Sequence, residues 1–118
     1  MTDLVACLST GKGTWTHVKG VISGCEWDNI FLITNEFGRE KFSSEKKVEL
    51  LVVDSNKQLL ELVEDIKKQL KDKITGTEVA LNLVSGTGKE HMAILSAVLK
   101  LGIGVRLVAL AKEGVKEI

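Results

Sequence analysis

Proline is absent from this chain of 118 residues, and so is any net charge. The absence of proline fits a compact fold in which strands and helices alternate and the connections are short. The 16 basic side chains balance the 16 acidic ones, so no overall positive field draws in nucleic acid over a distance. We therefore expect no direct binding to DNA, whereas a local basic pocket for a small phosphorylated ligand remains compatible with the composition.

Cysteine, histidine and long apolar runs are also scarce. No apolar segment is long enough to span a bilayer and no signal peptide is recognisable, so we expect a cytoplasmic protein that does not associate with membranes. Cys7 and Cys25 lack the spacing of metal ligands, which predicts reduced, structural thiols. His17 and His91 are isolated in the sequence, so we expect no metal site and no cofactor.

The sequence does contain a regular alternation of strand and helix patterns over one domain, residues 1–118. Short apolar runs predict strands at residues 4–8, 29–34, 48–53, 79–84 and 105–110. Helical patterns lie between several of them, at residues 14–22, from a cap at Asp54 or Ser55 to Gly76, and from residue 93 to Gly102. The pattern leaves the structure of residues 35–46 open, and a short charged tail follows from Lys112.

This alternation is typical of right-handed βαβ units. The sequence therefore predicts an α/β fold, a Rossmann-like three-layer sandwich with a mostly parallel sheet of five to six strands, in which the first and fourth strands are neighbours. The clearest helix is scaffold, because its apolar residues recur every three or four positions and its charges lie largely on the other side. These apolar residues are Leu59, Val63, Ile66, Leu70 and Ile74.

Two similar loops follow the first and fourth predicted strands. Each contains glycine, lysine and hydroxyl residues, and each leads into a helix. Glycine lets the backbone approach a ligand closely, and the first amides of a helix have no partner within it, so such loops favour anions. The alternative is that the glycines only shape the turns. The candidate ligand-binding residues are Ser9, Thr10, Gly11, Lys12, Gly13, Thr14, Ser85, Gly86, Thr87, Gly88, Lys89 and His91.

Two familiar phosphate-binding motifs fit these loops poorly. A P-loop requires glycine where Leu83 stands and Ser or Thr where Glu90 stands. The first loop has part of a dinucleotide fingerprint, but Thr16 occupies the third glycine position. Glu36, just past the second strand, could take the place of the ribose-binding acid, so a dinucleotide cofactor remains an alternative.

The remaining aromatic and histidine residues admit two interpretations each. Trp15 could stack on a nucleobase or pack against the edge of the sheet. Trp27 is expected in the core or at an interface. We expect His17 on the surface of a helix, whereas His91, two residues after Lys89, could contact a ligand.

The first predicted strand leads into Ser9-Thr10-Gly11-Lys12-Gly13-Thr14, and the strand that contains Asn82 leads into Ser85-Gly86-Thr87-Gly88-Lys89. In these two features the chain resembles the CRISPR-associated Rossmann-fold (CARF) sensor domains. The hallmark of that family is a strand ending in Asn, a Gly-Thr turn and a basic residue that opens the next helix, which Asn82, Gly86, Thr87 and Lys89 match. Here Gly88 separates the Gly-Thr pair from the lysine, which could change the reach of Lys89. The resemblance implies a homodimer that binds a cyclic oligoadenylate across its two-fold axis, in antiviral defence.

A domain of this type with no fused effector resembles either a stripped sensor or a ring nuclease. Cleavage needs no metal, because each ribose 2′-hydroxyl can attack the neighbouring phosphate if the protein aligns it and stabilises the charge that develops. The candidate catalytic residues are Lys89, Ser9 and Lys12, with Thr10 as an alternative to Ser9 and His91 as a possible proton carrier. The sequence does not separate a sensor from an enzyme, because both would use the same residues.

Overall fold

The computed structural model describes residues 2–9 and 11–118, with the backbone alone for Lys12. Its centre is a six-stranded sheet in the order β3-β2-β1-β4-β5-β6, in which the first five strands are parallel and β6 is antiparallel to β5. The strands are β1 (Asp3–Leu8), β2 (Ile30–Thr34), β3 (Glu49–Val52), β4 (Glu78–Asn82), β5 (Gly104–Ala111) and β6 (Gly114–Glu117). The predicted α/β fold, and the pairing of the first strand with the fourth, are confirmed.

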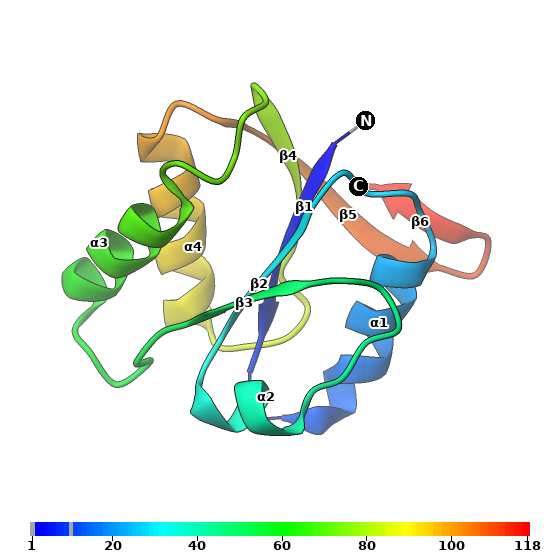
Figure 1. Cartoon of the computed structure of the whole chain (residues 1–118), viewed down its shortest axis with the longest axis horizontal. Coiled ribbons are helices and arrows are strands. Elements are labelled where there is room, and N and C mark those ends of the chain that lie inside the picture. Colours follow the sequence, from blue (N-terminus) through cyan, green and yellow to red (C-terminus); the bar gives the residue numbers. More distant parts are fainter. Residues whose placement is uncertain (1, 10) are drawn as a thin grey trace.

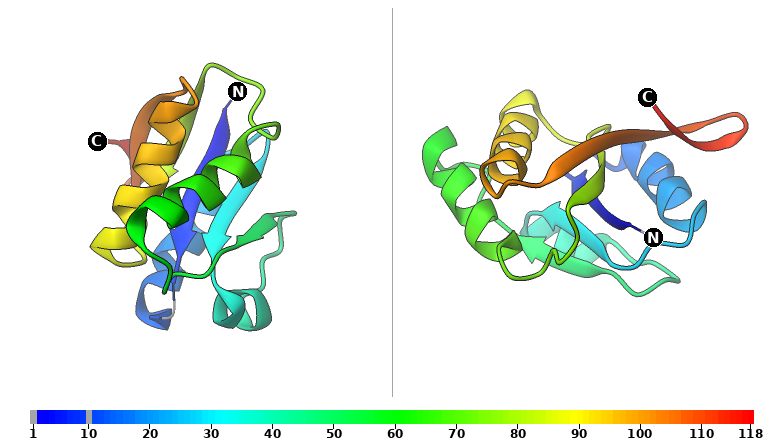
Figure 2. Two further views of the ribbon diagram at one scale, coloured as in Figure 1. Left: turned by 90° about the vertical axis from the view of Figure 1, so that its left-hand side faces the viewer. Right: turned by 90° about the horizontal axis from the view of Figure 1, so that it is seen from above.

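Helices cover both faces of the sheet, which gives three layers (Figures 1 and 2). The helices are α1 (Trp15–Ser23), α2 (Glu36–Lys41), α3 (Leu59–Leu70) and α4 (Gly88–Lys100), with a short 3-10 turn, Lys12–Thr14, before α1. One core lies between the sheet and the α3–α4 pair, and the other lies between the sheet and α1. All six residues of β1 are buried, because this central strand has a core on each side.

The boundaries of α3 differ from those that the sequence predicts. The helix begins at Leu59, and its N-cap, Gln58, makes no side-chain capping bond. Asp54 accepts a hydrogen bond from the backbone amide of Asn56 instead, so its side chain is satisfied in a local turn before the helix starts. The helix ends at Leu70 rather than near Gly76. Ile74 nevertheless remains buried in the core beside α3 and α4.

The segment that the sequence left open contains α2. Asn35 caps this helix by accepting a hydrogen bond from the backbone amide of Gly38 at 2.9 Å. Gly38 then lies directly on Thr34, since a Cβ atom added at Gly38 would be only 1.8 Å from the Thr34 hydroxyl oxygen. Phe42, just after the helix, enters the core on the α1 side and holds this segment against the sheet.

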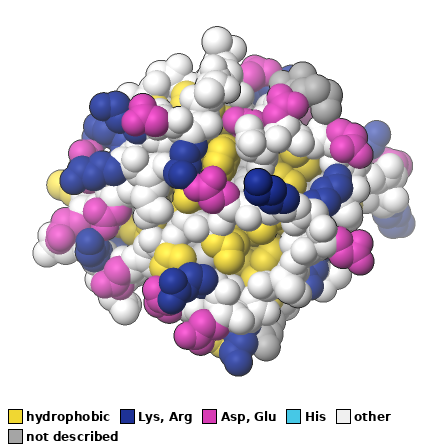
Figure 3. Space-filling view, viewed as in Figure 1, with side chains coloured by type: hydrophobic (Ala, Val, Ile, Leu, Met, Phe, Trp, Pro, Cys, Tyr) yellow, Lys and Arg dark blue, Asp and Glu magenta, His cyan; other side chains and the backbone are white. Residues whose placement is uncertain are grey.

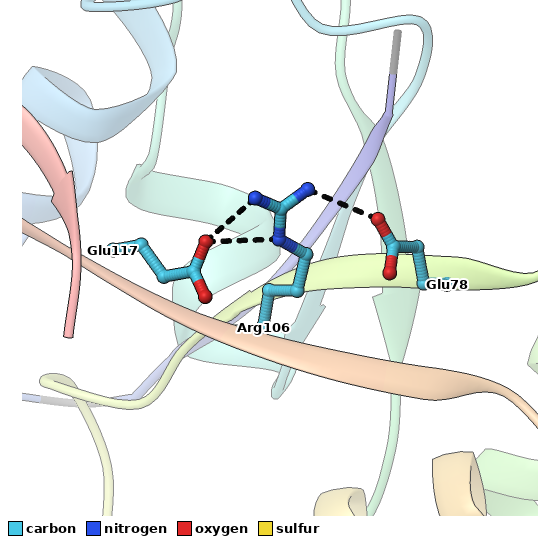
Figure 4. Close-up of polar contacts among 3 residues, drawn as sticks. All are labelled: Glu78, Arg106 and Glu117. Carbon is cyan, nitrogen blue, oxygen red and sulfur yellow. Dashed lines mark hydrogen bonds and ion pairs between the residues drawn. The ribbon is translucent and has the colours of Figure 1, made fainter.

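The charged tail folds into the sixth strand. Arg106 in β5 donates two hydrogen bonds to Glu117 in β6, at 2.9 and 2.6 Å, and one to Glu78 in β4 at 3.0 Å (Figure 4). Val115 packs against the core on the α1 side. The hairpin therefore gains an apolar anchor as well as an exposed group of ion pairs joining three neighbouring strands.

The surface carries both signs of charge, and the helices are short. On the face seen in Figure 3, acidic and basic side chains are interspersed around hydrophobic ones, in keeping with the balanced charge. Within residues 2–9 and 11–118, none of the helices is both long and apolar enough to cross a bilayer.

Candidate functional site

The two glycine loops meet at the carboxyl edge of the sheet, where β1 and β4 end side by side. The backbone amide of Ser9 donates a hydrogen bond to the hydroxyl oxygen of Ser85 at 3.0 Å. Both serines are buried, at 8% and 0% exposure. From β1 the sheet grows through β2 and β3 on one side and through β4 and β5 on the other, so the strand order reverses between β1 and β4. Open α/β sheets bind their ligands at such switch points. The structure therefore brings together the two loops that the sequence singles out.

Glu90 connects the two loops, although sequence reasoning used it only to reject a P-loop. Its carboxylate accepts hydrogen bonds from the backbone amide of Thr87 at 2.8 Å and from the hydroxyl of Ser9 at 3.4 Å. Thr87 in turn accepts a hydrogen bond from the amide of Glu90, which completes a capping box at the start of α4. The spacing Thr-x-x-Glu before an apolar helix is the sequence signal that could have identified this pair.

This capping box determines which amides of the second loop remain for a ligand. The amides of Thr87 and Glu90 already have acceptors, and the Thr87 hydroxyl is engaged as well. The amides of Gly88 and Lys89 belong to the first turn of α4, where the backbone has no acceptor within the helix, and both residues are exposed. An anion at this helix terminus would therefore contact Gly88 and Lys89 rather than the whole turn.

Of the two glycines in the second loop, the structure requires glycine at position 86 but not at position 88. Gly86 has φ of +112°, and a Cβ atom there would lie 2.6 Å from the Cys7 sulfur, so both the backbone conformation and the packing demand glycine. A Cβ atom at Gly88 would meet nothing within 4 Å. Gly88 thus leaves open space in front of the α4 amides, which suits the approach of a ligand.

The first loop has a similar opening. Gly11 and Gly13 are exposed, and a Cβ atom at either position would meet nothing within 4 Å. The Thr14 hydroxyl donates to the carbonyl oxygen of Gly11 at 3.3 Å, which tightens the turn before α1. Thr10 and the side chain of Lys12, both candidate site groups, lie outside the described residues.

Lys89 extends away from its own loop toward the connection between β3 and α3. Its ammonium group donates a hydrogen bond to the carbonyl oxygen of Ser55 at 2.9 Å. The side chain is exposed, and an ammonium group has three hydrogens to donate, so two remain for other acceptors. The carboxyl edge thus has a positive charge on its α3–α4 side.

The two histidines have defined partners. The Nε2 atom of His91 donates to the carbonyl oxygen of Ser85 at 2.8 Å, so His91 is fixed to the second loop. His17 lies on α1 and is half-buried. Its Nε2 atom accepts from the amide of Leu110 at 3.3 Å and lies 3.2 Å from the Asn82 amide nitrogen. His17 therefore ties α1 to the ends of β4 and β5.

Asn82, the residue that carries part of the family resemblance, has a structural role in this network. Only 1% of it is exposed, and its side-chain amide donates to the carbonyl oxygen of Val108 at 2.9 Å. Its own oxygen accepts from the amide of Val84 at 3.4 Å. Asn82 thus sets where β4 ends, two residues earlier than predicted, and directs the chain into the second loop.

The tryptophans and cysteines belong to the scaffold around the site. Trp15 is 7% exposed, donates from its indole to the carbonyl oxygen of Ser9 at 2.8 Å, and packs edge-on against Phe42, so the packing interpretation is the correct one. Trp27 lies half-buried against the core on the α1 side. Burial raises the pKa of the Cys7 thiol, and the Glu90 carboxylate raises it further. Cys7 is consequently a protonated, unreactive thiol.

No protein-family model matches the chain, and no curated protein matches its sequence. Among the described residues, no group of three or more His, Cys, Asp or Glu side chains could hold a metal ion. The fold itself is Rossmann-like, with a mostly parallel six-stranded sheet, and the family resemblance rests on the motif residues alone.

Proposed function

We propose that the protein binds a cyclic oligoadenylate, with the tetra-adenylate ring as the first candidate, at the carboxyl edge between β1 and β4. The observation that carries this proposal is the junction of the two glycine loops by Ser9, Ser85 and Glu90. The glycines at positions 11, 13 and 88 are exposed, and Lys89 lies in the first turn of the helix after the second loop, with its ammonium group extended toward Ser55. The adenylate is suggested by the likeness of Asn82, Gly86, Thr87 and Lys89 to the CARF motif.

A homodimer is part of the proposal. One neutral monomer offers few positive charges to a polyanionic ring, whereas a two-fold axis near the site would present each loop and each Lys89 twice. A ring with two-fold symmetry could then be bound identically by both copies. Light scattering at micromolar concentration, with and without cyclic tetra-adenylate, tests this part, and a monomer under both conditions would contradict it.

Binding is tested by calorimetry with cyclic tetra-adenylate and three lysine variants. A charge-assisted hydrogen bond contributes about 1.5–3 kcal/mol, so Lys89→Ala should weaken binding roughly tenfold or more. Lys12→Ala should have a similar effect. Lys68→Ala, which removes an exposed lysine of α3, is the control and should bind as the wild type does. Wild-type affinity in both loop variants would place the site elsewhere.

Catalysis is a second question at the same site. Lys89 and Lys12 would stabilise charge on the phosphate oxygens, and Ser9 would orient the ribose, in a cleavage that leaves a 2′,3′-cyclic phosphate. The hydroxyl of Ser9 donates to Glu90, so a ribose hydroxyl would have to compete for it. Incubation with cyclic tetra-adenylate in EDTA, followed by chromatography, separates an enzyme from a sensor. Linear products that Lys89→Ala no longer forms indicate an enzyme, and an intact ring after hours indicates a sensor.

A dinucleotide cofactor is the alternative ligand. It would place a ribose at Glu36, whose carboxylate forms an exposed ion pair with Arg39 at 2.6 Å. A competition experiment distinguishes the two, because NAD should displace a fluorescent cyclic adenylate only if both occupy the same edge. Binding of NAD in the absence of any cyclic adenylate binding would favour the alternative.

A further inference from the structure

A pocket of about 610 Å³ lies at the carboxyl ends of β2 and β3, on the same edge of the sheet as the glycine loops. The residues that line it are the last residue of β3 with the connection after it, positions 52–56, and the N-cap and first two residues of α2, positions 35–37. Pockets that bind small molecules commonly have volumes of about 300–1,000 Å³. The pocket can therefore accommodate a group as large as a nucleoside.

The charge of the lining excludes a phosphate from the pocket itself. Its ionisable groups are the carboxylates of Glu36 and Asp54, and none of the lining residues is Lys or Arg. Arg39 forms an ion pair with Glu36 at an exposed position, and Asp54 accepts one hydrogen bond from its own turn through Oδ1. An anion placed between two carboxylates would be repelled. The lining therefore suits an uncharged group that donates hydrogen bonds.

Three of the eight lining residues are apolar, and Asn35, Ser55 and Asn56 add neutral polar groups to the two carboxylates. The apolar members are Phe37, Val52 and Val53, and the centroid of the Phe37 ring lies 5.9 Å from that of Trp15 at the start of α1. A nucleoside has the matching composition, since its base presents apolar faces while its amine and ribose hydroxyl groups donate hydrogen bonds. Small-molecule sites typically combine apolar surface with polar groups that fix orientation, and this pocket contains both.

Lys89 links this pocket to the glycine loops. Its backbone opens α4, whereas its ammonium group donates to the carbonyl oxygen of Ser55 in the pocket lining. The positive charge thus lies at the boundary between the glycine loops and the acidic pocket. We infer that the pocket is the nucleoside subsite for a ligand whose adjoining phosphate contacts Lys89, an inference that rests on the proposed function.

The test uses adenosine, which carries no phosphate and so reports on the pocket alone. Titration of the 15N-labelled protein with adenosine should shift the backbone amides of residues 35–37 and 53–56. Asp54→Asn keeps the Oδ1 acceptor of the turn but removes the charge, and it should weaken adenosine binding roughly tenfold, as expected for loss of a charged acceptor. Asp72→Asn, an exposed carboxylate in the connection that leads into β4, is the matched control and should change nothing.

The outcomes separate this inference from the proposed function. Shifts confined to other residues, or wild-type affinity in Asp54→Asn, would overturn the subsite. Lys89→Ala should weaken binding of cyclic tetra-adenylate far more than binding of adenosine, because adenosine has no phosphate for the ammonium group to contact. If cyclic tetra-adenylate requires Lys89 but adenosine misses the pocket, only the subsite is wrong. If adenosine enters the pocket but no cyclic adenylate binds, the proposed function is wrong and the pocket remains a nucleoside site.

Discussion

The backbone amide of Ser9 donates to the hydroxyl of Ser85, a residue 76 positions later in the chain, across 3.0 Å. This one bond joins the ends of β1 and β4 just where each strand gives way to its glycine loop. Because Ser85 is fully buried, no water replaces its hydroxyl oxygen as an acceptor. The relative position of the two loops therefore depends on a buried side chain rather than on surface contacts.

Removing that hydroxyl should destabilise the protein. In Ser85→Ala the Ser9 amide would lose its acceptor while remaining buried, which costs about 1–3 kcal/mol. Urea denaturation followed by circular dichroism measures the free energy of unfolding. Ser43→Ala, at an exposed position, is the control and should remain within about 0.5 kcal/mol of wild type. Equal stability of both variants would mean that the Ser9 amide has another acceptor.

The two glycines of the second loop should respond oppositely to alanine. Gly86→Ala combines a positive φ with a 2.6 Å contact to the Cys7 sulfur and should cost at least about 1–2 kcal/mol. Gly88→Ala, at the open first position of α4, should be neutral or stabilise by up to about 1 kcal/mol. The same denaturation measurement compares them. Because Gly88→Ala covers the free amides, it should also weaken the proposed ligand binding without loss of stability.

The close contact between Thr34 and Gly38 gives a further prediction. The Thr34 hydroxyl is buried without a hydrogen-bond partner among the described residues. Thr34→Val, which keeps the shape and removes the hydroxyl, should therefore stabilise the protein by about 1 kcal/mol. Gly38→Ala should destabilise it, because the new methyl group would lie 1.8 Å from that hydroxyl oxygen. The double variant Thr34→Ala with Gly38→Ala should recover part of this loss, and strict additivity would contradict the contact.

Cys7 should make stability fall at alkaline pH. Burial raises the pKa of this thiol in the folded protein above that of the unfolded chain, near 8.5. Above that pH the unfolded state loses a proton that the folded state retains, so unfolding becomes easier by up to about 1.4 kcal/mol per pH unit. Denaturation between pH 7 and 10 should show this slope in the wild type and in Cys25→Ser. Cys7→Ala should lose it, and an unchanged slope would assign it to other groups.

The sequence by itself determined the layered architecture, because local patterns are enough for it. Apolar runs of β-strand length alternate with helical patterns, which leaves few topologies. The pairing of β1 with β4 follows from the Rossmann-like strand order that we predicted, and the structure has that order. The same reasoning placed both glycine loops at one edge of the sheet. It left α2 open, because six residues carry too short a periodic pattern to recognise, and it did not predict β6, where Glu117 pairs with Arg106.

Only the tertiary structure decided which site groups are free and which are engaged. Glu90 and Asn82 look like surface and strand-end residues in the sequence, yet both are buried and bonded to partners that the fold brings near. Lys89 extends to Ser55 in another connection, which no spacing rule could indicate. These contacts join residues far apart in the chain, so they depend on the packing of helices against the sheet rather than on local pattern.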